Sequence, residues 1–469
     1  MATTADIIFY GGDIITMEEG GEAKAEALAV SKDTILAVDS LETVMGLAGP
    51  ETELIFLNQQ TLMPGFIEPH QHALQCALMR SQYTNISALN NRSYADVSKV
   101  MNDKLSELAA DPDNKDWAIF FGWDPELIPD LPTLSADYLD QNFSSTIPIV
   151  VIGQSGHVAW INRIALETPS PVIGKDFPSP SGGTVVLDED GIPTGQLFEE
   201  PAMSLLMEKL PSVPTAAEIQ EALCRQARAY ALAGLTTVTD LLYRPTPAVD
   251  EALKAATDDP DFPTRIGLYR LIHAKKDDVD NSVEKKGDCQ GPSEGQDGPA
   301  SPFQGGVGQY SEKLWEAGLK LVADGSPHCG TAAVREPFMN TPLTETLGFP
   351  PAPSYGILNM ESDALYDTIK RHHKEGKQFA IHCHGERSSE QVLKVYEQVL
   401  SEFPDQDNRH RMEHLGLTTV DQIARAGKIH LCLSFFVDHL RFYGLVYKTD
   451  IFGDRVNRWT PLSEATKHG

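Results

Sequence analysis

The sequence predicts an α/β fold: a (β/α)8 barrel with a small β-rich part before it and a long insertion within it. From Leu62 onward, strand-like apolar segments alternate with helical segments, which is typical of parallel βα units. Several helical segments reach a glycine just before the next strand, where helices commonly end. The 469 residues are enough for one such barrel with additions, or for two domains.

The first sixty residues form short strands separated by turns rather than βα units. We expect residues 1–60 to be part of a small β-sandwich and residues 61–469 to form the barrel. The expected strands of the first part are Asp6–Phe9, Ile14–Met17, Ala27–Val30, Ile35–Val38 and Leu54–Leu57.

Seven segments that lie next to helical segments are predicted to be barrel strands. Helices are expected at Thr215–Ala233, Ser362–Glu375 and Thr419–Ala426. The seven strands are Leu62–Pro69, Leu235–Asp240, Arg265–Ile272, Leu319–Ala323, Phe379–Cys383, Arg411–His414 and Ile429–Phe435.

Two stretches do not fit the βα pattern. Residues 75–214 are too many for one crossover and carry their own strands at Trp117–Gly122 and Ile147–Ile152, so we expect an insertion that acts as a lid over one end of the barrel. Residues 284–310 are rich in Gly, Pro, Ser and Gln without periodicity, which predicts a mobile loop.

The composition excludes several classes of function. A formal charge of −29 would repel nucleic acid phosphates, and no apolar run approaches the roughly 18 residues of a membrane helix. The N-terminus lacks a basic stretch and an apolar core, so a cytoplasmic location is expected. The six cysteines have no CxxC spacing, which predicts free thiols. A homodimer is one option for the oligomeric state.

His70 and His72 stand at the end of the first predicted barrel strand. Residues i and i+2 of a strand point the same way, so both imidazoles can face one point at the end where barrels place their active sites. Two converging imidazoles suit Zn²⁺ or a similar divalent ion. A single His-x-His pair is also compatible with a merely polar strand end.

Three other strands present a basic side chain at the same end. His382 ends one apolar strand, His414 ends another, and Lys320 lies inside a third. A barrel that places all of these at one face is better explained by a metal centre than by chance. In the alternative, Lys320 pairs with a nearby acid such as Asp324.

The combined motifs resemble the amidohydrolase superfamily, and within it the group called YtcJ-like, which includes N-substituted formamide deformylase. The resemblance runs from residue 6 to the C-terminus. It is specific for the group but not for a substrate. Its carriers are Leu62–His72, Gly156–Asn162, Pro193–Glu199, Gly234–Asp240, Lys320–Gly325, Ile381–Arg387 and Arg411–His414.

The resemblance implies a (β/α)8 barrel, a β-sandwich formed by both chain ends, and one or two divalent ions, usually zinc. It implies hydrolysis of a non-peptide C–N bond in a small molecule, such as an amide, formamide or cyclic amide, by a metal-activated hydroxide. Lys320 matches the lysine that is carboxylated and bridges two metals in dinuclear members. The implied metal ligands are His70, His72, Lys320, His382 and His414.

Three further histidines are expected to contact substrate, each with a simpler alternative. His157 belongs to the insertion and either lines the pocket or is a buried hydrogen-bonding residue. His328 follows a strand end in a Gly-Ser-Pro-His-Cys-Gly loop. His384 stands where the group usually has an apolar residue, and it either contacts substrate or is a satisfied histidine behind the metal ligands.

The catalytic acid or base is not identified in this sequence. In the family an aspartate at the end of strand eight has this role, but Leu462–His468 is a predicted helix and Gly469 is the last residue. Because a barrel without one strand has two open edges, we expect this chain to be a fragment rather than a natural truncation. The alternatives are a mononuclear deaminase or esterase of the same superfamily, and an inactive truncated homologue.

Overall fold

The structure is a computed structural model that describes residues 4–18, 24–111, 116–168, 172–180, 182–207, 214–274, 312–404, 406 and 408–468. Two compact units make up the chain. The first consists of Met1–Ile67 with Tyr230–Thr237, and the second of Glu68–Ala229 with Val238–Gly469. The predicted loop at 284–310 lies outside the described residues.

The first unit is built on a single sheet in which strands have the order β3-β2-β1-β4, with β5 paired to β1. Its buried centre contains Ile8, Ala27, Ala29 and Val44. One sheet is described, so the second layer of a sandwich stays a prediction. The elements are β1 (Ala5–Ile15), β2 (Lys24–Ser31), β3 (Thr34–Asp39), α1 (Leu41–Met45), β4 (Ala48–Phe56) and β5 (Thr61–Leu62).

The seven predicted barrel strands are confirmed, and they lie in one sheet in chain order, β18-β17-β16-β15-β14-β13-β6. The four pairings from β14 to β18 are parallel. The strands are β6 (Phe66–Gln71), β13 (Leu235–Tyr243), β14 (Arg265–Leu271), β15 (Leu314–Val322), β16 (Phe379–Cys383), β17 (Arg411–His414) and β18 (Cys432–Phe435).

The predicted helices are confirmed with small changes at their ends. At the start of α12, the Thr419 hydroxyl accepts a hydrogen bond from the Gln422 N–H, and the Gln422 side chain accepts one from the Thr419 N–H, so Thr419 caps a helix that starts at Val420, one residue later than predicted. It continues through Gly427 to Lys428, which delays β18 to Cys432. The helices after the insertion are α7 (Ala216–Leu232), α8 (Pro247–Thr257), α9 (Pro342–Thr346), α10 (Ser362–Lys374), α11 (Glu386–Glu402), α12 (Val420–Lys428), α13 (Asp438–Val446) and α14 (Leu462–His468), with short turns at Pro327–Cys329, Tyr447–Ile451 and Gly453–Arg458.

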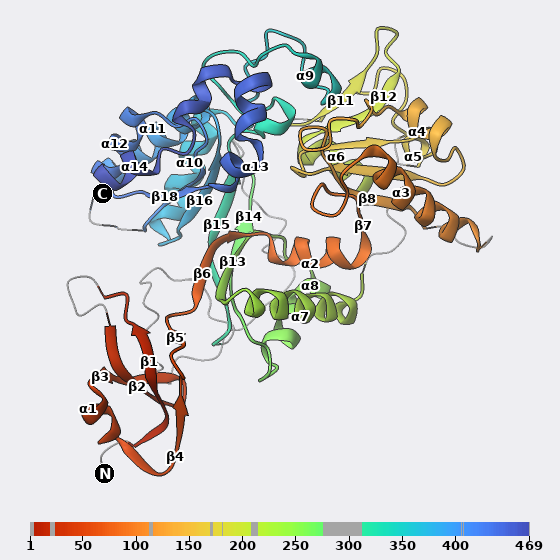
Figure 1. The fold of residues 1–469 in the computed structure, drawn as a ribbon. Coiled ribbons are helices and arrows are strands. Elements are labelled where there is room, and N and C mark those ends of the chain that lie inside the picture. The colour runs from red at the N-terminus through yellow and green to blue at the C-terminus, as the bar shows by residue number, and fades with distance from the viewer. Residues whose placement is uncertain are drawn as a thin grey trace. The chain divides into compact units, whose positions relative to one another are not determined.

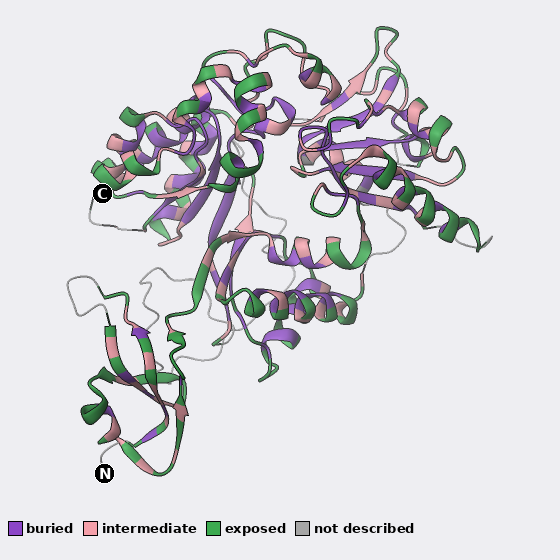
Figure 2. Cartoon of the chain, viewed as in Figure 1, coloured by how far each residue is buried: buried purple, intermediate pink, exposed green. Residues whose placement is uncertain are grey.

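The main core of the barrel lies between its strands and the helices α10, α11 and α12 on their outer side (Figure 1). Every residue of β16 is buried, as the purple strands in Figure 2 show. Leu321, Phe379, Ile381 and Tyr396 are fully inaccessible members of this core. Burial of each large apolar side chain contributes roughly 1.5–3 kcal/mol, which holds the strand ends in place.

The insertion is a layer of its own, with a six-stranded sheet of order β11-β12-β10-β9-β8-β7. The two strands predicted in it correspond to β8 and β9, and both are buried. Its elements are α2 (Ala73–Gln82), β7 (Thr84–Asn85), α3 (Tyr94–Ala109), β8 (Ala118–Trp123), α4 (Ala136–Asn142), β9 (Ile149–Gly153), β10 (Val158–Ile161), α5 (Arg163–Glu167), β11 (Thr184–Leu187), β12 (Pro193–Phe198) and α6 (Glu199–Met207).

Two expectations from the sequence concern membrane-spanning helices and the state of the cysteines. Among the described residues, no helix is long and apolar enough to cross a membrane. The five described cysteines are free thiols, as expected, and Cys289 lies outside the described residues.

A buried histidine pair joins α10 to the start of β17. The Nε2 of His410 lies 2.9 Å from the Nδ1 of His373, and the Nδ1 of His410 accepts a hydrogen bond of 3.1 Å from the Phe379 N–H. Tyr396 stacks on the His410 ring. Burial, with a smaller effect of His373, lowers the pKa of His410 to about 3, so this imidazole is neutral in the folded chain.

Acid should therefore weaken the fold through His410. Between pH 6.5 and about 3 the unfolded chain binds the proton and the folded chain does not, so stability falls as the pH is lowered through this range. A His410→Asn variant keeps an acceptor for Phe379 but cannot ionise. Urea unfolding from pH 7 to pH 5 should show the wild type losing about 1.4 kcal/mol per pH unit more than this variant below pH 6.5. Parallel pH profiles would contradict the assignment.

Candidate functional site

The structure brings five predicted metal-site residues to one end of the barrel sheet. His70 lies in β6, His72 precedes α2, Lys320 lies in β15, His382 in β16, and His414 ends β17. The ring centroids of His70 and His72 are 5.5 Å apart, those of His70 and His414 are 4.6 Å apart, and those of His382 and His414 are 4.4 Å apart. The charge of Lys320 acts on all four imidazoles and lowers their pKa values further below the ordinary range, after burial as the largest cause.

A buried carboxylate ties the first of these strands to the sixth. The Oε2 of Glu413 lies 2.7 Å from the Nδ1 of His70, while Arg411 donates to both oxygens of Glu413, and Arg411 also donates to the Pro69 carbonyl. β6 and β17 are separated by four strands in the sheet order, so these bonds are compatible only with a curled sheet. The barrel is nearly closed at the site.

The charges around Glu413 keep it ionised. Burial alone would raise the pKa of its carboxyl, but the hydrogen bond and charge of His70, followed by Arg411 and Lys320, outweigh burial and lower the pKa to about 2. Because the carboxylate is an acceptor, the Nδ1 of His70 carries the proton. The Nε2 of His70, which is buried and has no hydrogen-bond partner among the residues described, is left with a free lone pair.

A backbone carbonyl orients His382 in a similar way. The Nε2 of His382 donates to the Gly325 carbonyl at 2.9 Å, which leaves its Nδ1 as the nitrogen with a free lone pair. His414 and the following Leu415 both have positive φ angles, 71° and 52°, which are strained for residues with a side chain. Strain of this kind persists where the surrounding structure holds a side chain in one place.

Lys320 is buried, and its Nζ has no hydrogen-bond partner among the described residues. Burial lowers the pKa of this amine to about 8; Glu413 opposes the shift and Arg411 adds to it. The alternative in which Lys320 pairs with Asp324 is wrong, because the Asp324 carboxylate is used elsewhere. It accepts hydrogen bonds from the N–H groups of Ala333, His384 and Gly385 and from the Ser388 hydroxyl.

The donor set fits a divalent metal ion. Burial lowers the pKa values of His72, His382, His384 and His414 well below the ordinary value, so these imidazoles are neutral and offer lone pairs. Several buried polar atoms at the site have no hydrogen-bond partner in the part of the chain that the structure describes, a situation that costs free energy unless a ligand satisfies them. These atoms are His70 Nε2, His72 Nδ1, Lys320 Nζ and His384 Nδ1.

His157 reaches the site from the insertion. Its ring centroid lies 5.5 Å from that of His382, and its Nδ1 lies 2.8 Å from the Oε2 of Glu199, whose Oε1 accepts a bond of 2.6 Å from the Thr331 hydroxyl. Burial lowers the pKa of His157, but the Glu199 carboxylate outweighs burial and raises the pKa above its ordinary value. Glu199 therefore orients the His157 ring.

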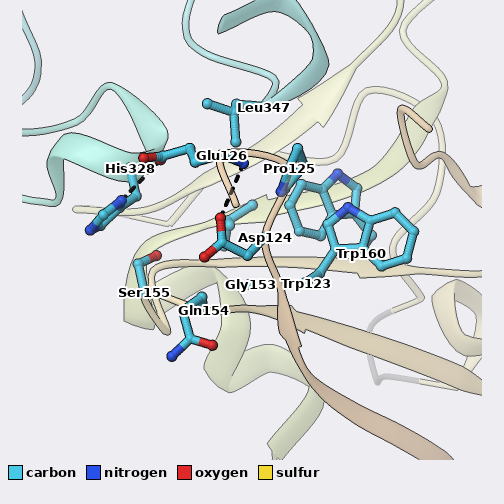
Figure 3. A pocket seen from close by; sticks show the side chains of 11 residues that line it. Trp123, Asp124, Pro125, Glu126, Gly153, Gln154, Ser155, Trp160, His328 and Leu347 are labelled. Carbon is cyan, nitrogen blue, oxygen red and sulfur yellow. Dashed lines mark hydrogen bonds and ion pairs between the residues drawn. The ribbon is translucent and has the colours of Figure 1, made fainter. Parts of the chain in front are cut away.

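His328 is the one predicted site residue that the structure does not bring into this group. It lies on the turn Pro327–Cys329, where its Nδ1 is 2.9 Å from Glu126 and its Nε2 is 3.3 Å from the Nε2 of His439. Figure 3 shows His328 and Glu126 paired at a cavity of about 20 Å³, which has room for about one water molecule. Trp123 and Trp160 line the same cavity.

Three side chains in the site or beside His328 were not predicted from the sequence. Glu413 had a detectable signal, because Arg411 and Glu413 stand on either side of Met412 in a short buried strand and so place two charges on one face. No sequence pattern pointed to Glu126 or His439. They come from the insertion and from α13, and only folding places them next to His328.

Comparison with known proteins identifies the family of this chain. A sequence model of the amidohydrolase family matches residues 53–469. The chain belongs to the amidohydrolase family. It is 27% identical over 431 residues to the putative amidohydrolase YtcJ of Bacillus subtilis (strain 168), covering 91% of this chain and 72% of that protein. It is 26% identical over 445 residues to the protein LONG AFTER FAR-RED 3 of Arabidopsis thaliana, and the match covers 93% of this chain and 68% of that protein.

A solved structure shows the same fold. An uncharacterized metal-dependent hydrolase from Pyrococcus horikoshii OT3 is 19% identical, with a TM-score of 0.66 over 98% of this chain and 80% of that chain. The predicted resemblance to the YtcJ-like group is confirmed, and the fold is an α/β barrel. Family membership supports a hydrolase of the amidohydrolase superfamily.

Glu413→Gln tests the bridge between β6 and β17. The variant leaves Arg411 as an uncompensated buried charge, so we expect a loss of about 3–5 kcal/mol in stability. The control is Glu397→Gln, which removes a partly exposed partner of Arg425 and should cost at most about 1 kcal/mol. Unfolding midpoints in urea measure both variants. An equal, small loss in the two would show that the bridge does not hold the barrel together.

Proposed function

We propose that this chain is a metal-dependent amidohydrolase that hydrolyses a non-peptide C–N bond in a small molecule. The observation that carries the proposal is the convergence of buried, unpartnered nitrogen atoms at the end of an α/β barrel. Neutral imidazoles favour zinc over the oxygen-seeking ions Mg²⁺ and Ca²⁺. The family supplies the reaction class, and the substrate class belongs to the proposal.

The residues that would hold the metal are those at the four strand ends. A bound divalent ion lowers the pKa of water and polarises the carbonyl group under attack. His70 and His72 come from the first strand, His382 and His414 from the fifth and sixth, and Lys320 from the fourth. Carboxylation of the Lys320 amine by CO₂, with release of a proton, would turn it into an anion that can bridge two ions.

The surrounding residues keep these side chains in place. Glu413 holds the proton on the Nδ1 of His70 and directs the Nε2 into the site, and the Gly325 carbonyl does the same for the Nδ1 of His382. Arg411 donates hydrogen bonds to both oxygens of Glu413, which offsets the charge of this buried carboxylate. Preorganisation of this kind avoids reorganising the site during the reaction.

His157 is proposed as a substrate contact. Its Nδ1 is bonded to Glu199, so its Nε2 is the nitrogen that can meet the polar group of a substrate beside His382. His328 is proposed to act at the edge of the substrate pocket, because His439 lies between it and the metal site. Its partner Glu126 supplies a carboxylate and a hydrogen-bond acceptor at this edge.

Metal removal tests the proposed function. The purified chain should contain at least one divalent ion per molecule by elemental analysis, and dialysis against a chelator should abolish hydrolysis of an active substrate. Re-addition of Zn²⁺ should restore it. The substrates to try first are N-substituted formamides, followed by linear and cyclic amides. A metal-free protein whose hydrolysis resists the chelator would refute metal dependence.

His157→Gln tests the substrate contact. Loss of one hydrogen bond to substrate is worth about 1.4 kcal/mol, so we expect an approximately tenfold increase in KM with a smaller change in kcat. The metal content should equal that of the wild type. If the variant instead loses its metal at unchanged KM, His157 supports the ligands and does not bind substrate.

A further inference from the structure

We propose that His384 is a metal ligand, and that His382, His384 and His414 together bind one divalent ion that does not require a carboxylated Lys320. This inference rests on the proposed metal dependence and deepens it. The sequence left His384 as either a substrate contact or a satisfied histidine behind the ligands. The structure favours neither of these roles.

The geometry joins His384 to two of the expected ligands. Each of the three histidines offers a ring nitrogen, and these nitrogens all lie within 4.8 Å of one another. The ring centroids of His382 and His384 are 5.1 Å apart, and those of His384 and His414 are 4.6 Å apart with nearly parallel planes. Nitrogens bound to one zinc ion at about 2.0–2.1 Å must be separated by roughly 3–4 Å, so small rotations of the rings complete the site.

One ring nitrogen of His384 is unsatisfied. The residue is 4% exposed, and its Nδ1 is buried without a hydrogen-bond partner among the described residues. Its two other ring neighbours, His439 and Trp459, stack on it. A buried imidazole with a free nitrogen is explained by an ion that takes the lone pair.

The backbone holds the ring where it is. The N–H groups of His384 and Gly385 both donate to Asp324 at 2.9 Å, which fixes the chain as it leaves β16. His382 and His384 are separated by one residue at the end of this strand, the same spacing that His70 and His72 have at the end of β6. The barrel therefore presents two His-x-His pairs, one from its first strand and one from its fifth.

The chemistry of this trio differs from that of a lysine-bridged pair of ions. Three neutral imidazoles form a complete protein donor set for one zinc ion with a fourth position free. None of the three depends on an anionic Lys320. The inference therefore expects one ion to stay bound when Lys320 cannot be carboxylated.

The experiment measures metal binding and not activity. The metal-free chain is titrated with Zn²⁺ in competition with a chromophoric chelator, and zinc-edge X-ray absorption counts the imidazole ligands at one ion per chain. The variants are His384→Leu, which restores the apolar residue usual in the group, and Lys320→Met. His439→Phe is the matched control, because it keeps the ring that stacks on His384 but removes the neighbouring nitrogen.

We expect Lys320→Met and His439→Phe to keep a tightly bound ion with three imidazole ligands. His384→Leu should bind that ion more than about 100-fold more weakly, beyond the 10–100-fold effect of residues that only support a ligand. Affinity and spectrum unchanged in His384→Leu would overturn the inference. An equal loss in His439→Phe would overturn it as well, because packing would then explain the effect.

Two results separate this inference from the proposed function. A wild type that binds no divalent ion refutes the proposed function itself. A wild type that binds an ion which His384→Leu binds equally tightly refutes only the role of His384. Because His70 and His72 can also supply imidazoles, the ligands are counted in a His70→Asn, His72→Asn double variant. Three imidazoles at its ion support the inference, and two refute the role of His384 even where His384→Leu fails to fold.

Discussion

The site depends on one buried interaction, the carboxylate of Glu413 between His70 and Arg411. It joins β6 to β17 across the interior of the barrel and fixes the tautomer of a candidate metal ligand in the same contact. A buried carboxylate is costly unless both of its oxygens are paired. In Glu413, Arg411 donates to both oxygens and His70 lies against one of them. The curvature of the sheet and the orientation of His70 therefore have a common cause.

Burial also keeps the nitrogen atoms of the site neutral. The chain carries a formal charge of −29, yet the interior of the site is rich in imidazole and contains an amine. Removal from water lowers the pKa values of these groups, so His72, His382 and His414 are neutral and the pKa of Lys320 falls to about 8. Neutral nitrogen is the form that binds a metal ion or reacts with CO₂, so the low polarity of the barrel end prepares the donor set.

The barrel was easier to predict than the insertion. Strands such as Phe379–Cys383 are buried on both sides and lie between long helices, so their apolar runs stand out in the sequence. In the insertion, β10, β11 and β12 are short, and β10 pairs with β12 across a long stretch of chain. Short strands leave only a brief pattern in the sequence, and the β10–β12 pairing is set by packing, so only β8 and β9 were predicted.

The sequence by itself determined the fold class, the family and the histidines and lysine at the strand ends, because strand periodicity places i and i+2 on one side and parallel strands end at one edge. Tertiary structure alone decided how these side chains are used. It paired His70 with Glu413, used Asp324 to hold the backbone at His384 rather than to pair with Lys320, and set His328 apart with Glu126. Such choices depend on which distant groups meet in a space without water, where each unpaired polar atom is costly, and no local pattern carries that information.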